Sequence, residues 1–338
     1  MDVPDLGSLH RTLLATNFIS LAQHTGAAVL KKILVVDDSP IDRMLVGRLL
    51  ESNAGWSVQF AEDGRLAIEA LESMANEPSP SLPDLIVTDL QMPYINGLEL
   101  VNHIKQSFPS IPIVLITGFG SEKVAMEALR SGAANYTPKS GLKKDLLRTV
   151  EHVLEMSQWV RVDQAHTSNS SAAEEECQLA FVLENDSSLI GPLIEHLQTK
   201  LPKWSEPHRL QIGMALDEAL VNAMHHGNLE VESSLRADGD NEDDEDLYYK
   251  EIRNRKTLEP FCDRRVQVRA SFSGDSIEVQ IKDEGAGFDP TQVADPRAEE
   301  NLTKVSGRGL FLIRTFMDAV THNPEGNEIT LLKNRKKV

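Results

Sequence analysis

The chain has few cysteines and no long apolar run. Its two cysteines, Cys177 and Cys262, lie far apart and form no CxxC pair. This excludes a disulfide framework or a cysteine zinc cluster and is typical of a reducing compartment. The sequence also lacks an apolar run of about 18 residues, and its first charged residues are the acidic Asp2 and Asp5. These features match neither a transmembrane helix nor a signal peptide, so we expect a cytoplasmic protein without membrane attachment.

Basic residues are also scarce relative to acidic ones, 34 against 52, and the formal net charge is −18. Nucleic acids and anionic membrane surfaces attract basic patches, so neither is expected as a direct partner. Nucleotides are not excluded, because proteins hold their phosphates with backbone amides and Mg²⁺ rather than with net charge. A chain of 338 residues is longer than a single domain with one hydrophobic core usually is, so two domains are predicted.

The first patterned region covers residues 31–156, after an N-terminal extension, residues 1–30, that has no clear periodicity. Short apolar runs alternate there with amphipathic segments of helical period, and the last predicted helix runs from Leu142 to about Met156. The runs are Ile33–Val36, Val58–Phe60, Leu85–Val87, Ile113–Ile116 and Ala134–Thr137. This alternation predicts βα repeats around a doubly wound, five-stranded parallel sheet. Ligands of such sheets bind at the carboxyl ends of the strands.

Five polar residues fall at those carboxyl ends. Asp37 and Asp38 end the first predicted strand, Asp89 the third and Thr117 the fourth, and Lys139 follows the fifth. Converging carboxylates repel one another unless a divalent cation binds, and oxygen ligands suit Mg²⁺. The carboxylate of Asp89 is a competent nucleophile for a phosphoryl group, which the lysine and the hydroxyl would contact.

The segments "ILVVDDSP", "DLIVTDLQMPYINGLEL", "PIVLITGFG" and "GAANYTPKS" resemble the receiver domain of two-component response regulators, which has a flavodoxin-like fold. The resemblance implies that Asp89 is the phosphoacceptor. It also implies that Asp37, Asp38 and the Gln91 carbonyl join Asp89 in binding Mg²⁺. An upstream histidine kinase or phosphotransfer protein would supply the phosphoryl group.

Thr117 and Tyr136 match the switch pair of that family, in which the hydroxyl moves to the phosphoryl group and the ring turns inward. Lys139 matches the lysine that contacts the phosphoryl group. The chain departs from the family pattern at Ser140, where a proline is usual, while Pro138 precedes the lysine instead.

A polar segment, residues 157–176, is predicted to be a linker to a second patterned region, residues 177–338. This region mixes strands and helices without regular alternation, which predicts an α+β sandwich. Predicted strands at Gln178–Leu183, Val266–Phe272, Ser276–Lys282 and Glu328–Leu332 accompany helices at about Glu206–His226 and Gly309–Val320. Residues 229–262 interrupt the pattern with seven acidic residues between Asp238 and Asp246. They predict a solvated, loop-like or disordered insertion.

A second group of polar residues and glycines lies in this region. Glu218 and Asn222 are spaced i and i+4 on an otherwise apolar helix, so they share one face. Asp283–Gly287 follows a predicted strand, and Ser306–Leu310 precedes a predicted helix. Glycines at such junctions permit close approach of a ligand, and amides at a helix start bind phosphate oxygens.

The segments "DEALVNAMHHGN", "DEGAGFD" and "SGRGLFLIRTFMD" resemble the N box and the two glycine boxes of the GHKL ATPase superfamily. Within it, the chain is similar to the anti-sigma-factor serine kinases. The resemblance implies that Asn222 ligates the Mg²⁺ of Mg·ATP, that Asp283 accepts from the adenine amino group, and that Glu218 is the general base.

The same resemblance assigns the glycines of both boxes. Gly285 and Gly287 would shape the nucleotide floor. Gly307, Arg308 and Gly309 would belong to the lid over the phosphates, whose mobile part is Pro290–Val305. His225 and His226 follow the N box and are interpreted as structural or solvated.

The leading hypothesis is a phosphorylation-controlled switch whose ATP-binding domain phosphorylates Ser or Thr on an anti-sigma-factor antagonist, or sequesters a sigma factor. One alternative is a non-catalytic module in which ATP sets the shape of a protein-binding surface. A divergent histidine kinase is a third, although the sequence shows no helical hairpin with a His followed by an acidic residue. Members of both families often dimerise, so a homodimer is an expectation by analogy.

Overall fold

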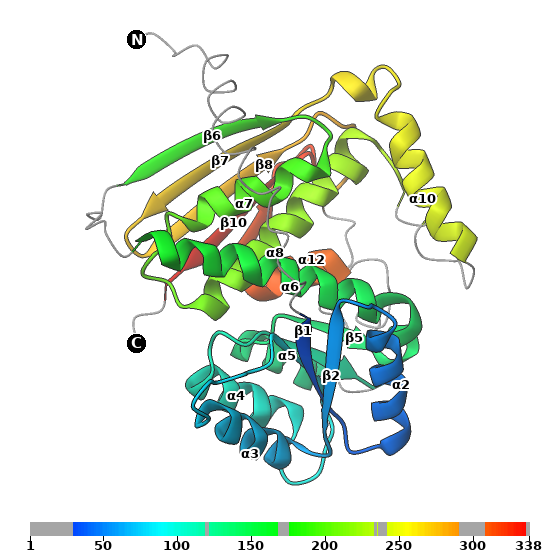
Figure 1. Cartoon of the computed structure of the whole chain (residues 1–338). Helices are drawn as coiled ribbons and strands as arrows, with labels where there is room; N and C mark the ends of the chain where they lie inside the picture. The colour runs from blue at the N-terminus through cyan, green and yellow to red at the C-terminus, as the bar shows by residue number, and fades with distance from the viewer. Residues whose placement is uncertain are drawn as a thin grey trace.

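The computed structural model describes residues 30–118, 122–167, 176–232, 235, 242–290 and 308–335. Two five-stranded sheets form the framework. The long helix α6 (Leu142–Thr167) lies between the two halves of the molecule that contain these sheets, as Figure 1 shows. Residues 1–29, most of the predicted extension, lie outside the described ranges. Within these ranges no helix is long and apolar enough to cross a membrane.

The N-terminal half is the expected flavodoxin-like domain. All pairings in its sheet are parallel, in the order β2-β1-β3-β4-β5. Every residue of β3 and β4 is buried, which explains their continuous apolar sequences. The elements before α6 are β1 (Lys31–Val36), α2 (Pro40–Glu51), β2 (Trp56–Ala61), α3 (Gly64–Ala75), β3 (Leu85–Asp89), α4 (Gly97–Ser107), β4 (Ile113–Thr117), α5 (Glu122–Ser131), β5 (Asn135–Pro138) and the 3₁₀ turn η1 (Lys139–Gly141).

The C-terminal half is the expected α+β domain. Its sheet is antiparallel, in the order β6-β7-β8-β10-β9, and one face of β7 and β8 is buried at alternate positions. Its elements are β6 (Cys177–Leu183), η2 (Ser187–Leu189), α7 (Ile190–Gln198), α8 (Glu206–Asn222), the π-helical η3 (Ala223–Asn228), α10 (Glu242–Arg255), η4 (Phe261–Asp263), β7 (Val266–Ser273), β8 (Ser276–Lys282), α12 (Arg308–Phe316), β9 (Ala319–His322) and β10 (Glu328–Asn334).

Two helix ends differ from the prediction. The helix expected to end near Met156 continues to Thr167, so the first residues of the predicted linker are helical. Contacts with the second domain support this extension, because the ring of Trp159 lies against Gly191 and Arg209 donates to the Val160 carbonyl at 3.0 Å. The helix predicted to run to Val320 instead ends at Phe316, and β9 follows as an edge strand.

The prediction of a loop-like acidic insertion is wrong for residues 242–255, which form α10. A small apolar cluster anchors this helix. Tyr248 and Ile252, one turn apart, are buried with Leu229 and Val231 from the segment after η3.

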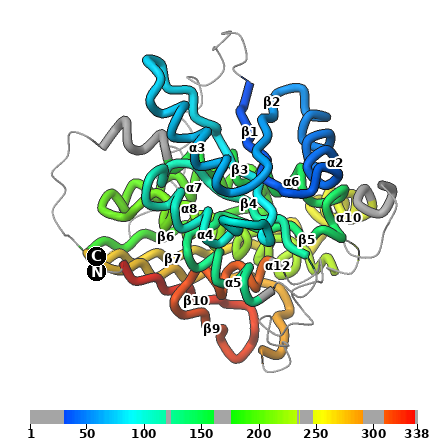
Figure 2. The backbone as a smooth tube through the Cα atoms, turned by 90° about the horizontal axis from the view of Figure 1, so that it is seen from below, coloured from blue at the N-terminus to red at the C-terminus, as the bar shows by residue number. Residues whose placement is uncertain are grey.

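The two domains share one continuous apolar core. Gln211 of α8 is buried, and its side-chain amide donates to the carbonyls of Leu129, at 2.7 Å, and Ala133, at 3.2 Å, in the first domain. Helix α12 lies beside α5 and near β5 in Figure 2. The ring of Tyr136 on β5 meets that of Phe311 on α12 edge to face, with 5.8 Å between centroids.

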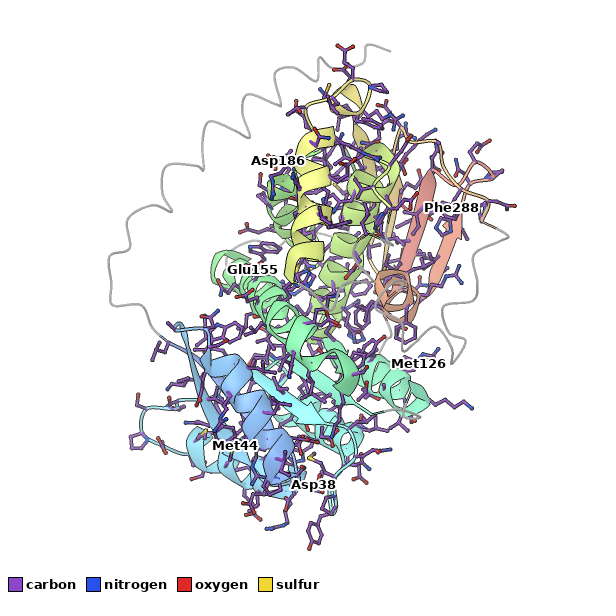
Figure 3. All side chains as sticks on the ribbon, turned by 90° about the vertical axis from the view of Figure 1, so that its right-hand side faces the viewer. Asp38, Met44, Met126, Glu155, Asp186 and Phe288 are labelled. Atoms are coloured by element: carbon purple, nitrogen blue, oxygen red, sulfur yellow. The ribbon has the colours of Figure 1, made fainter. Side chains whose placement is uncertain are left out.

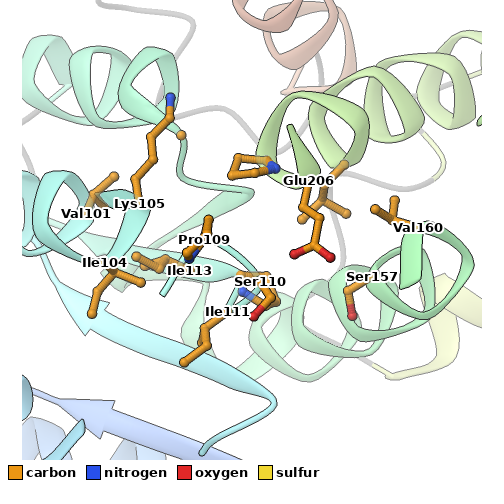
Figure 4. Close-up of a pocket in the computed structure, with 14 residues that line it drawn as sticks. Val101, Ile104, Lys105, Pro109, Ser110, Ile111, Ile113, Ser157, Val160 and Glu206 are labelled. Atoms are coloured by element: carbon orange, nitrogen blue, oxygen red, sulfur yellow. The ribbon is translucent and has the colours of Figure 1, made fainter. Parts of the chain in front are cut away.

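On another side of the interface the domains close tightly. The cleft in Figure 4 lies between Val101, Ile104 and Pro109 of the first domain, Val160 of α6, and the start of α8 at Glu206. Its volume is about 20 Å³, close to the room that one water molecule needs. Side chains of both domains therefore fill this part of the interface.

Candidate functional site

The first candidate site is a cluster of three carboxylates at the carboxyl end of the parallel sheet. Asp37, Asp38 and Asp89 each place an oxygen within 4.8 Å of the others. Burial, with the neighbouring charge of Asp89, raises the pKa of Asp37 to about 6 despite a hydrogen bond from the Ser39 amide. Among the described residues, Oδ2 of Asp37 is buried without a hydrogen-bond partner. An orphaned carboxylate oxygen in an all-oxygen cluster fits a divalent cation such as Mg²⁺.

Lys139 reaches this cluster from the end of β5. Its Nζ lies 3.1 Å from Oδ2 of Asp89 and 2.8 Å from Oδ2 of Asp42. Burial lowers the pKa of Lys139, but the bonds to Asp42 and Asp89 outweigh it and raise that pKa. For Asp89 the effect of burial has the opposite sign: it raises the pKa of the carboxyl group, and the nearby charge of Lys139 offsets only part of that rise. Ser140, the departure from the receiver pattern, does not displace the lysine. The sequence analysis missed Asp42, whose only signal was its place in the first turn after the Asp pair.

The remaining receiver residues lie around this cluster. Thr117 is buried at the end of β4, the strand next to β3 in the sheet. Tyr136 is buried on β5 and faces α12 of the second domain. Gln91 follows Asp89 in a bend, and its amide hydrogen-bonds the Asp89 carboxylate. The predicted role of the Gln91 carbonyl as a metal ligand stays a prediction.

The second candidate site is built on one face of α8. Glu218 and Asn222 lie one turn apart, and the start of α12 covers them. A Cβ placed on Gly309 would lie 2.4 Å from Oε2 of Glu218 and 3.8 Å from Nδ2 of Asn222. A side chain at this position would therefore displace the Glu218 carboxylate, which is the flexible end of that residue. The structure thus brings the N box and the second glycine box together.

The first glycine box closes the other end of this site. Asp283 follows β8, and burial raises the pKa of its carboxyl group to about 6. Its Oδ1 accepts from the Gly285 amide at 2.9 Å. Gly227 packs against the carboxylate so closely that a Cβ would lie 2.4 Å from its carbon. Gly287 has a φ of +72°, which favours glycine, and a Cβ there would lie 2.0 Å from the Glu325 carbonyl oxygen.

Asn228, which the sequence analysis passed over, ties these loops together. It is fully buried, accepts from the Glu284 amide and donates to the Asn185 side chain, both at 2.8 Å. The sequence feature that could have pointed to Asn228 is its position as the last residue of the N box. The histidines before it make internal contacts: His225 lies 3.2 Å from the Tyr248 hydroxyl, and His226 2.6 Å from the Val231 carbonyl oxygen.

Part of the predicted lid lies outside the described residues, namely Gly307 and residues 291–305. Arg308 is the first residue of α12, and its side chain is not described. Pro290 is the last described residue before this gap. The predicted roles of Gly307 and Arg308 stay predictions.

Comparison with known protein families gives two matches. Residues 33–151 match the model of the response regulator receiver domain. Residues 193–333 match the model of the histidine kinase-like ATPase domain.

Curated relatives match part of the chain. The chain is 35% identical over 127 residues to a protein-glutamate methylesterase/protein-glutamine glutaminase of Treponema denticola, covering 36% of this chain and 32% of that one. It is 35% identical over 123 residues to the response regulator MprA of a Mycobacterium species, covering 36% of this chain and 50% of that one. The chain thus spans between about a third and a half of the length of these relatives.

Among solved structures, the receiver domain of NtrX from Brucella abortus is 32% identical. The match covers 36% of this chain and 98% of that one, with a TM-score of 0.33. The two family matches coincide with the two sheets of the fold: the chain contains a response regulator receiver domain followed by a histidine kinase-like ATPase domain.

Proposed function

We propose that the chain is a signalling switch in which phosphorylation of Asp89 controls an ATP-dependent protein serine/threonine kinase domain. The donor would be a histidine kinase or phosphotransfer protein, and the acceptor an anti-sigma-factor antagonist in the cytoplasm. One observation carries the proposal. Helix α12 contacts both sites, with Gly309 against Glu218 of the ATP site and Phe311 against Tyr136 of the receiver domain.

The receiver residues fit the first phosphoryl transfer. A carboxylate oxygen of Asp89 attacks the phosphorus of the donor, and the bond between that phosphorus and the donor atom breaks. Lys139, 3.1 Å from Oδ2 of Asp89, is placed to contact an oxygen of the transferred group. Asp37, Asp38 and Asp89 would hold Mg²⁺, which when bound neutralises the charge that gathers at the site.

Glu218 fits the second transfer as general base. It would take the proton of a Ser or Thr hydroxyl on the partner, whose oxygen attacks the γ-phosphorus of ATP. The bond from that phosphorus to the β,γ-bridging oxygen breaks, and ADP leaves. Asn222 would bind the Mg²⁺ that accompanies ATP. Asp283, when ionised, would accept from the adenine amino group.

The contact between the domains fits control of the second site by the first. A new charge on Asp89 would draw the Thr117 hydroxyl and shift the Tyr136 ring. Because Phe311 meets that ring and lies two residues after Gly309, movement of Tyr136 would reach the start of α12 over Glu218. Packed interfaces that switch between two arrangements carry coupling of this kind in other proteins.

The test is transfer of label from γ-³²P-ATP to candidate antagonist proteins. Wild-type protein should produce an acid-stable, base-labile label, as phosphoserine and phosphothreonine do. Glu218→Gln should bind ATP with unchanged affinity and lose roughly a hundredfold or more in transfer rate, the scale of general-base catalysis. ATP binding without transfer by the wild type, across all candidate partners, would favour the non-catalytic binding module. Acid-labile label on the protein itself would favour the histidine-kinase alternative.

A further inference from the structure

A cavity of about 430 Å³ lies where the receiver helix α6 faces the ATP site. Glu218 and Gly309 line it from the ATPase domain, and Tyr248 and Tyr249 line it from α10. Helix α6 of the receiver domain lines the cavity opposite α8, α12 and α10. Figure 3 places Glu155 on this helix, between the two halves of the molecule. The interface is thus open at the predicted general base, while it is nearly closed at the cleft of Figure 4.

His152 of α6 projects into this cavity and contacts the N box. Its Nε2 lies 3.0 Å from Oδ2 of Asp217, the residue directly before Glu218. The contact becomes an ion pair when His152 is protonated. Both side chains are mostly buried, with exposed fractions of 27% and 18%, so solvent screens the pair less than it would at the surface.

Five of the ten other charged and titratable groups around the cavity are carboxylates. On α6 they are Lys144, Asp145, Arg148, Glu151 and Glu155. Opposite them are Asp217 and Glu218 of α8, His225 of η3, and the two tyrosines of α10. Burial lowers the pKa of His152, but the bond to Asp217 and the charges of Asp217, Glu218 and Glu155 outweigh it and raise that pKa.

We propose that His152 is a positioning residue of the ATPase site, supplied by the receiver domain: by pairing with Asp217 it fixes the N-box turn that carries Glu218. This rests on the proposed kinase function and adds to it a second route between the domains. A displacement of α6 relative to α8 would separate His152 from Asp217 and release the turn. Misplacement of a catalytic group by about 1 Å can cost roughly a hundredfold in rate.

The ion pair between His152 and Asp217 is expected to weaken as the pH rises. Since the pKa of His152 is raised in the folded protein, the charged pair is fully present below the ordinary value of 6.5. It is lost as the pH rises through the raised value. Any effect of replacing His152 should therefore be largest at low pH and decline above that value.

The experiment compares the steady-state phosphotransfer kinetics of full-length wild type, His152→Gln and the control His103→Gln between pH 5.5 and 9. His103 also lies on a receiver helix near a carboxylate, 3.9 Å from Glu72, but away from the ATP site. We expect His152→Gln to lower kcat roughly tenfold or more at low pH, with KM for ATP unchanged. We expect His103→Gln to match the wild type at every pH.

A second readout does not depend on turnover. The imidazole signal of His152 in an NMR titration should show a raised pKa in the wild type, and Asp217→Asn should lower it. If the wild type transfers label but His152→Gln has the same kcat and pH profile, or if Asp217→Asn leaves the His152 titration unchanged, the positioning role is wrong and the kinase function stands. If the wild type transfers no label, both are wrong.

Discussion

The contact between Tyr136 and Phe311 gives the sharpest quantitative prediction. The two rings meet edge to face, with centroids 5.8 Å apart and planes at 81°. Both side chains are buried, with exposed fractions of 4% and 2%. Phe311→Leu keeps an apolar side chain at this position and removes the aromatic pair, which is worth about 0.5–1.5 kcal/mol beyond the area buried.

If this pair carries the coupling, its loss should reduce the response of the ATPase domain to receiver phosphorylation. A coupling of about 0.5–1.5 kcal/mol corresponds to a factor of roughly 2 to 12. The assay is the ratio of phosphotransfer rates with and without a small acyl-phosphate donor. We expect Phe311→Leu to lower this ratio by that factor while the unstimulated rate changes less.

Phe316→Leu is the matched control, because Phe316 is buried on the same helix with an exposed fraction of 1%. Tyr136→Leu and the double variant complete a double-mutant cycle, which isolates the pairwise energy. A coupling energy indistinguishable from zero, or an equal loss of response in Phe311→Leu and Phe316→Leu, would refute the reasoning.

Three further predictions concern the ATP site and the interface. The affinity for ATP should fall roughly fivefold between pH 6 and pH 5, because the Asp283 carboxyl, with a pKa of about 6, loses most of its charge over that range. Isothermal titration calorimetry would show a flat profile if Asp283 did not bind the nucleotide. Gly309→Ala should abolish phosphotransfer without unfolding the protein, since its methyl group would lie 2.4 Å from Glu218 Oε2. Normal turnover by this variant would contradict the close packing of α12 on α8. Gln211→Leu should lower the free energy of unfolding by about 1–3 kcal/mol, because the Leu129 carbonyl, 2.7 Å away, loses its hydrogen-bond donor inside the interface. An unchanged midpoint of denaturant unfolding would show that the bond is dispensable.

Much of the architecture could be predicted because local sequence patterns determine it. Strands buried on both faces need continuous apolar runs, so β3 and β4 stand out in the sequence. The carboxyl ends of neighbouring parallel strands meet at one edge, which brings Asp37 and Asp89 together once the strand order is assumed.

Contacts between distant segments could not be predicted in this way. Helix α10 was hidden because its acidic first turns resemble a solvated loop, while the cluster that anchors Tyr248 comes from residues after η3. The extension of α6 beyond Met156 gains support from distant segments, through Trp159 against Gly191 of α7 and the Val160 carbonyl against Arg209 of α8. The pair between His152 and Asp217 joins two domains, and although Asp217 begins the N box, His152 belongs to no motif that would have drawn attention to it.

The central claim is that the state of Asp89 controls chemistry at Glu218. The most direct test measures the rate of ³²P transfer from ATP to the partner protein with and without an acyl-phosphate donor, in wild type and in Asp89→Asn. The account predicts that the donor changes the wild-type rate and leaves the rate of Asp89→Asn unchanged. Equal rates with and without the donor in the wild type, under conditions where Asp89 is shown to be phosphorylated, would contradict it.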